Sequence, residues 1–152
     1  GFNDSELDYI VDHAVLPLAK AVRAQALVIC CGADCLAGDP LSTMMLSNVA
    51  LWRAVDELLE LGLPTVILGG GGYNPWTLTR YWTGLWGRIS GQAIPDELPQ
   101  QAIDLLHGME CDLVDEEDID VCWYPTRADS PTAGTVRDSV RSVADSIEGN
   151  FQ

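Results

Sequence analysis

Two short apolar runs, each followed by a loop and then by a helical pattern, constrain the fold of this chain most strongly. Residues 26–31 read Ala-Leu-Val-Ile-Cys-Cys and residues 65–68 read Thr-Val-Ile-Leu, with no charged side chain in either. Continuous apolar runs of this length are typical of strands buried on both faces of a parallel sheet. A helix predicted between them completes a right-handed βαβ unit. The sequence therefore predicts an α/β protein.

Helical periodicity and capping residues predict the segments around these strands. Residues 4–24 place their apolar side chains on one helical face, and Pro17 predicts a kink or a break within it. Ser47 or Asn48 is predicted to cap the helix between the two strands, which Gly62 ends. A third helix is predicted to begin at Asn74-Pro75 and to end at Gly91.

The region after residue 91 has weaker patterns. A short helix is predicted from Pro99 through Leu106, followed by a solvated acidic loop over 110–120. A last amphipathic helix is predicted to dock on the body of the protein through Val136, Val140, Val143 and Ile147.

Two parallel strands do not make a stable open sheet, because each needs neighbouring strands. We therefore expect residues 1–152 to be the trailing, C-terminal portion of one larger domain, unless partner chains complete it. Residues 1–91 would form the βαβ core with both motif loops, and residues 92–152 the acidic loop and the last helix. The exposed sheet edge would favour self-association.

The charge of the chain limits its partners. The formal net charge is −15 over 152 residues. Nucleic acids and anionic membrane surfaces attract proteins through Lys and Arg, so neither is an expected partner. An acidic surface would steer cationic substrates such as lysine-rich tails or polyamines, or it simply keeps the protein soluble.

The cysteines indicate a reducing compartment. Cys30, Cys31 and Cys35 crowd one strand and the loop after it, and no histidine lies near them in the sequence. A structural zinc site is therefore not expected, and we interpret the five cysteines as buried thiols. We also find no signal peptide and no apolar stretch long enough to span a bilayer. Together these features predict a cytoplasmic protein.

The loops that follow the two strands carry the chemistry. Asp34 follows the first strand and Tyr73 follows the second, and ligands bind at this edge of open α/β sheets. Asp34 would ligate a metal or cap a turn, and Tyr73 would donate a hydrogen bond to a carbonyl or only pack. One carboxylate cannot hold zinc alone, and neither His13 nor His107 is placed to help.

Four consecutive glycines at 69–72 indicate backbone that approaches a ligand closely. A phosphate-binding loop is the main alternative, since its backbone N–H groups also need such freedom. The dinucleotide-binding pattern would need glycine at position 74, where Asn74 stands, and no Gly-Lys-Ser or Gly-Lys-Thr is present. The loop is therefore predicted to wall a ligand channel.

These motifs resemble the zinc-dependent histone deacetylase family. The resemblance rests on Gly-Ala-Asp-Cys-Leu-Ala-Gly-Asp-Pro-Leu at 32–41, on Leu-Gly-Gly-Gly-Gly-Tyr-Asn at 68–74, and on the spacing and helix between them. Pro75-Trp76 and Tyr81-Trp82-Thr83-Gly84 look most like the bacterial acetoin-utilization branch. The likeness extends from Gly1 to about Pro99.

The resemblance implies a fold, a cofactor and roles for four residues. The fold would be the C-terminal part of an arginase/deacetylase-like three-layer α/β/α domain with a mostly parallel sheet. Asp34 would be a ligand of catalytic Zn²⁺, and Tyr73 would hydrogen-bond the acyl oxygen in the transition state. Leu41 and the backbone of Gly71 would line the acyl-lysine tunnel. Cys35 stands where a small hydroxyl residue is often expected.

The family's paired histidines and its Asp-x-His zinc ligands do not occur in these residues, and they would lie upstream. We therefore expect a C-terminal fragment of a zinc-dependent amidohydrolase that removes acetyl or other acyl groups from lysine or other amines. The substrate would be an acetylated lysine peptide or a small acetylated amine, and the isolated fragment would be inactive. The alternative is a non-catalytic acidic binding or assembly module on the same scaffold.

Overall fold

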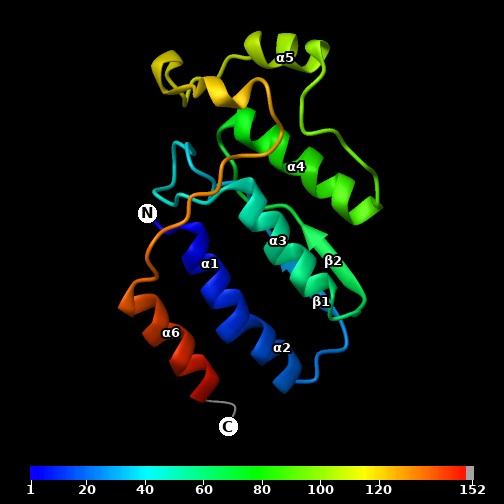
Figure 1. The fold of residues 1–152 in the computed structure, drawn as a ribbon, viewed down its shortest axis with the longest axis vertical. Coiled ribbons are helices and arrows are strands. Elements are labelled where there is room, and N and C mark those ends of the chain that lie inside the picture. The colour runs from blue at the N-terminus through cyan, green and yellow to red at the C-terminus, as the bar shows by residue number, and fades with distance from the viewer. Residues whose placement is uncertain (150–152) are drawn as a thin grey trace.

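The computed structural model describes residues 1–149, and for Glu148 and Gly149 only the backbone (Figure 1). Two parallel strands, β1 (Leu27–Cys30) and β2 (Thr65–Leu68), are flanked by helices along the chain. The helices are α1 (Asp4–Ile10), η1 (Val11–Val15), α2 (Leu16–Ala21), α3 (Asn48–Leu59), α4 (Pro75–Ser90), α5 (Gln100–His107), η2 (Glu116–Asp118), η3 (Val121–Trp123) and α6 (Asp138–Gly149).

The first helical segment is one rod with a wider turn at its centre. Asn3 and Glu6 form a reciprocal capping box at its start. The π-helical η1 comes just before α2, whose first turn contains Pro17. Proline has no backbone N–H, and a local change of helical pitch accommodates that loss. Instead of a break at Pro17, the helix therefore continues through it with a π-helical turn just before, and it ends at Ala21 rather than at residue 24.

Both predicted strands are confirmed, with Leu27 paired to Thr65 and Cys30 to Leu68. Ile29 and Ile67 pack against the core beneath α3 and α4. On the other face, the exposed fraction is 69% for Val28 and 55% for Val66. Burial of the strands on both faces is therefore wrong for this structure, because within residues 1–149 no element covers that face.

The core lies where α3 crosses α4. Trp52 and Tyr81 are buried there, and the Trp52 indole donates to the Tyr81 carbonyl at 2.9 Å. Gly84 permits the close crossing, since a Cβ atom there would lie 2.0 Å from Cζ2 of Trp52. The predicted caps of both helices are confirmed: Ser47 caps α3, and Asn74 with Pro75 begins α4.

The region after residue 91 crosses the top of α4 and returns along the first helical rod (Figure 1). The short helix predicted after Pro99 is confirmed as α5. The last helix docks through Val140 and Ala144, both buried. Val143 is 53% exposed, so its predicted inward position is wrong. The small Ala144 faces inward instead, because it sits one residue further around the helix.

Polar contacts join this region to the rest of the molecule. The Asp4 carboxylate accepts hydrogen bonds from Ser47 and from Thr132, and all of these donors lie far from it in sequence. Arg137 donates to Glu6, with Nε and Oε1 2.5 Å apart. Buried polar groups need such partners, so these contacts fix where the chain returns.

The thiols are more accessible than the sequence suggests. All five cysteines are free, Cys30 and Cys122 are exposed, and the other three are half-buried. The prediction of buried thiols is therefore wrong, and for Cys30 the cause is the uncovered face of β1. Across residues 1–149, no helix is both long and apolar enough to cross a bilayer.

Candidate active site

The two motif loops meet at their backbones. The Ala33 N–H donates to the Gly71 carbonyl at 2.7 Å, which extends the β1–β2 pairing beyond the strands. A Cβ atom on Gly70 would lie 3.0 Å from Cα of Gly32, so the two chains are in contact without side chains between them. The tetraglycine loop thus allows close approach of its own partner loop, not only of a ligand.

Asp34 lies against this contact and keeps its carboxylate free. A Cβ atom on Gly71 would lie 2.2 Å from Oδ2 of Asp34, so the carboxylate rests on the bare glycine backbone. Asp34 is half-buried. Among residues 1–149 its oxygens form no hydrogen bond or ion pair. A carboxylate with unused lone pairs at a strand end is able to accept a cation.

Tyr73 is positioned through its backbone. Its N–H donates to Oδ2 of Asp39 at 2.8 Å, and the Leu41 N–H donates to Oδ1 of the same carboxylate at 2.9 Å. Asp39 is buried, so these charge-assisted bonds hold Tyr73 and Leu41 at fixed separation. The Tyr73 side chain is 42% exposed and Leu41 is 63% exposed. Both side chains are therefore open to a ligand.

Asp39 belongs to the 32–41 motif, but the sequence alone predicts no role for it. The available signal was a second carboxylate in the loop after the first strand, five residues beyond Asp34 and between Gly38 and Pro40. What the sequence does not reveal is its partner, since Tyr73 is 34 residues away. The structure thus brings Asp34 next to Gly71 directly, and joins Leu41 to Tyr73 through Asp39.

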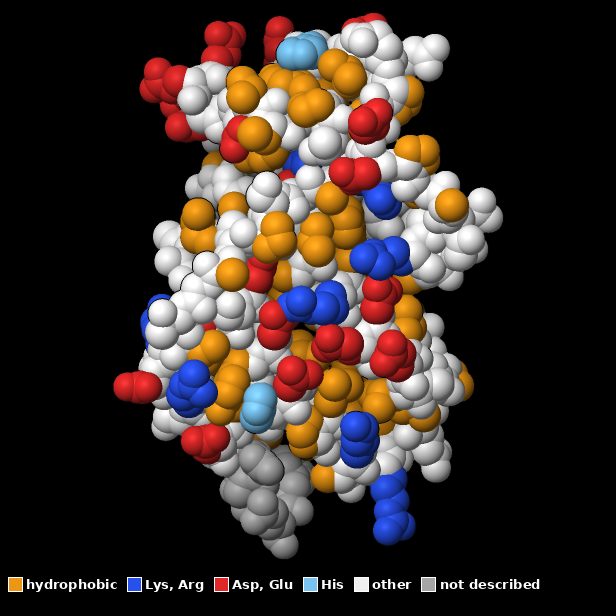
Figure 2. Space-filling view, viewed as in Figure 1, with side chains coloured by type: hydrophobic (Ala, Val, Ile, Leu, Met, Phe, Trp, Pro, Cys, Tyr) orange, Lys and Arg blue, Asp and Glu red, His pale blue; other side chains and the backbone are white. Residues whose placement is uncertain are grey.

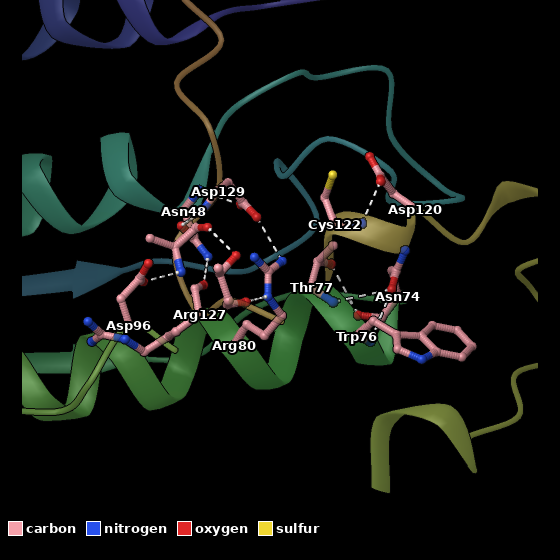
Figure 3. Close-up of polar contacts among 12 residues, drawn as sticks. Asn48, Asn74, Trp76, Thr77, Arg80, Asp96, Asp120, Cys122, Arg127 and Asp129 are labelled. Carbon is pink, nitrogen blue, oxygen red and sulfur yellow. Dashed lines mark hydrogen bonds and ion pairs between the residues drawn. The ribbon is translucent and has the colours of Figure 1, made fainter. Parts of the chain in front are cut away.

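The region after residue 91 covers the back of these loops. The Trp123 ring packs directly against Gly38: a Cβ atom added to this glycine would lie 2.6 Å from the ring. The Asn74 side chain donates to the Gly38 carbonyl at 2.8 Å, and Cys111 contacts the Tyr73 carbonyl at 3.7 Å. Close to these contacts, Asn74 caps α4 and Asp120 caps η3 (Figure 3). Trp123 and Cys111 therefore cover part of the site, whereas the side chains of Tyr73 and Leu41 remain exposed.

The Cys35 thiol stays protonated next to Asp34. Burial, followed by the negative charge of Asp34, raises its pKa to about 11. The thiol donates to the Gly32 carbonyl at 3.4 Å. At neutral pH Cys35 therefore acts as a packed hydrogen-bond donor rather than as an anionic neighbour of Asp34.

The donor set fits one metal ligand and not a complete site. Within the part of the chain that the structure describes, no three His, Cys, Asp or Glu side chains gather closely enough to hold a metal ion. His13 stacks on Tyr9 and His107 stacks on Tyr124, both away from Asp34. The free Asp34 carboxylate suits a zinc ion whose remaining ligands come from elsewhere.

The chain is similar to known proteins of one family. Residues 1–89 match the family model described as Histone deacetylase domain. The chain is 31% identical to Histone deacetylase 8 of Danio rerio over 140 residues, which are 91% of this chain and 34% of the relative. It is 41% identical over 90 residues to Putative histone deacetylase 2 of Caenorhabditis elegans, covering 59% of this chain and 18% of that protein.

Solved structures give the same result over the whole chain. The crystal structure of an HDAC homologue from Aquifex aeolicus superposes with a TM-score of 0.89 at 32% identity, covering 97% of this chain and 40% of that one. An HDAC homologue complexed with SAHA superposes with a TM-score of 0.87 at 31% identity over the same shares. The chain therefore spans well under half of the length of the relatives that it matches.

Proposed function

Because the chain belongs to the histone deacetylase family and has its arginase/deacetylase-like α/β fold, we propose that it supplies part of a zinc-dependent amidohydrolase site. The reaction is removal of acetyl or other acyl groups from lysine or other amines. One observation carries the proposal: the Ala33–Gly71 backbone contact brings the Asp34 and Tyr73 loops to one sheet edge.

Each residue of this edge has a role that its geometry supports. Asp34 would ligate zinc through its carboxylate oxygens, to which no group among residues 1–149 is hydrogen-bonded. When bound, zinc would polarise the amide carbonyl and activate water. The Tyr73 hydroxyl would donate a hydrogen bond to the acyl oxygen as negative charge develops on it. Leu41 and the Gly71 backbone would line the acyl tunnel, with Asp39 holding Leu41 and Tyr73 in place.

The remaining groups of the site would come from outside these residues. The chain spans 34% and 43% of two related histone deacetylases, of Danio rerio and Xenopus laevis. We propose that a longer protein contributes the paired histidines, which exchange protons with water and the leaving amine, and the Asp-x-His zinc ligands. We further propose that the protein belongs to the bacterial acetoin-utilization branch and acts in the cytoplasm.

The surface charge supports a cationic substrate. Figure 2 shows acidic side chains gathered at the end of the molecule where residues 110–120 lie. This segment reaches the active-site loops through the contact of Cys111 with Tyr73. With a net charge of −15, the protein would attract lysine-rich peptides or small polyamines carrying one acetyl group.

Two substitutions in the longer zinc-loaded protein test the roles separately. Tyr73→Phe should lower kcat on an acetyl-lysine peptide by roughly two to three orders of magnitude, the effect of losing one oxyanion donor, with zinc content unchanged. Asp34→Asn should lower zinc content itself, measured by elemental analysis. Tyr9→Phe and Asp12→Asn, on the distant first helical rod, are the matched controls. An unchanged rate for Tyr73→Phe would disprove its role.

The uncovered sheet face favours a second function, that of a non-catalytic assembly module. Val28, Val66 and Leu68 are exposed there, and β1 and β2 each have an unpaired edge within residues 1–149. If this alternative holds, the purified chain should self-associate without zinc in sedimentation experiments, and Val66→Lys should restore a monomer. If the enzyme proposal holds, the isolated chain with zinc should not hydrolyse an acetyl-lysine peptide.

A further inference from the structure

A cavity lies between α4 and α5, away from the motif loops. Its volume is about 660 Å³, within the usual range for small-molecule sites. Most of its wall is apolar and comes from the segment after α4 and from α5: Ile94, Leu98, Ala102, Leu105 and Leu106. No residue proposed for the zinc site lines it, so the cavity is a separate feature.

One charged group on the cavity wall has no charged partner among the described residues. Arg127 is half-buried, and no carboxylate among residues 1–149 lies within ion-pair distance of its guanidinium. Its Nε is closed to solvent and has no hydrogen-bond acceptor in the described part of the chain. Its hydrogen bonds are made by the backbone, through the N–H to Asp96 and through the carbonyl from Asn48 (Figure 3). The side chain lies over Trp52, with Cζ 5.2 Å from the ring centroid.

The other charged groups on the wall do not supply a counterion. Arg80 is buried and pairs with Asp129 at 2.7 Å, so its charge is already compensated (Figure 3). Glu97 is the one carboxylate of the lining, and it is exposed to water, which screens its charge. A half-buried, uncompensated guanidinium beside an apolar wall favours a ligand that carries one negative charge and a hydrocarbon body.

We propose that this cavity binds an aliphatic monocarboxylate. The hydrocarbon chain lies on the wall formed by Ile94, Leu98 and Ala102. The carboxylate accepts hydrogen bonds from the Arg127 guanidinium after a side-chain adjustment of the kind that binding commonly produces. This site requires neither zinc nor the proposed hydrolysis.

Calorimetric titration of the 152-residue chain in EDTA tests the site, with octanoate as the probe and 1-octanol as its uncharged match. Octanoate should bind at one site per chain and more tightly than octanol. Arg127→Gln should weaken octanoate binding by about tenfold or more, the effect of losing a charge-assisted hydrogen bond, and leave octanol binding unchanged. Arg23→Gln, an exposed arginine without an ion pair, should change neither.

Two further variants keep Arg127 and its packing on Trp52 in place. Glu97→Gln removes a charge that water already screens and should leave the binding of both probes nearly unchanged. Ala102→Phe fills the cavity and should abolish binding of both probes. Equal affinity for octanoate and octanol, no octanoate binding, or unchanged octanoate binding in the Arg127 variant would each overturn the proposal. None of these results would bear on the deacetylase site, which EDTA leaves without metal.

Discussion

Residues 1–91 and residues 92–149 are held in place by different forces. The first region is built on a shared apolar core at the α3–α4 crossing and on glycine backbone contacts. The second region contributes Leu106, Val114 and Trp123 to a smaller apolar cluster that closes on Trp76 of α4, and it is also tied to the first region by buried carboxylates and amides. Substitutions in the first region should therefore lower the free energy of unfolding. Substitutions in the second region should mainly weaken its attachment to the first.

Replacing one tryptophan in each region gives the largest expected contrast. Trp52→Ala should lower the free energy of unfolding by about 3–5 kcal/mol, because the cavity opens at the centre of the main core. Trp123→Ala removes an equally large side chain from the smaller apolar cluster, where the residue is 8% exposed against 2% for Trp52, and should cost clearly less. Urea denaturation followed by far-UV circular dichroism measures both. Equal losses would mean that the two regions form one cooperative core.

Glycine backbone contacts should matter for metal binding more than for folding. Gly71→Ala places a methyl group on the Asp34 carboxylate and should weaken zinc binding by the longer protein about tenfold or more. Gly69→Ala is the matched control, since its nearest neighbour would be Trp82 at 3.5 Å. Neither glycine has a positive φ, so backbone strain does not enter the comparison. Equal zinc affinities for the two variants would contradict the placement of Asp34.

The smallest expected effect concerns the tie between Glu6 and Arg137. Hydrogen bonds from Arg137 lower the pKa of Glu6 from 4.5 to about 2. A lowered pKa in the folded state stabilises the protein above pH 4.5, and this contribution is lost as the pH falls toward 2. In Glu6→Gln, thermal stability should therefore change less over this interval than in the unchanged protein. Glu117→Gln, at an exposed position, should behave like the unchanged protein.

Local signals in the sequence predict the elements of the first region well. Thr65–Leu68 is the strand as predicted, and Asn74, Pro75 and Gly91 bound α4 as their types suggest. These predictions succeed because each depends on a few adjacent residues. The exposure of Val28 and Cys30 could not be predicted, because burial depends on which elements cover the sheet.

The site shows the same limit. Motif spacing predicts that the loops of Asp34 and Tyr73 lie at one sheet edge, and the backbones of these loops do meet. The Asp39 carboxylate and the covering Trp123 ring were not identified, because their partners lie tens of residues away. In the second region the pattern chose Val143, whereas the docking geometry buries Ala144. Long-range polar contacts and the exact rotation of a helix are not encoded in local periodicity.

The position of Trp123 has a practical consequence for anyone trimming this protein. The recognised domain match stops at residue 89, which makes Ser90 an attractive place to cut. A version shortened there would lose the indole that fills the space beside Gly38. Water would then reach Asp39, and the hydrogen bond that Asp39 accepts from the Tyr73 N–H would weaken. The family match thus ends before Trp123, a residue that packs against the motif loop.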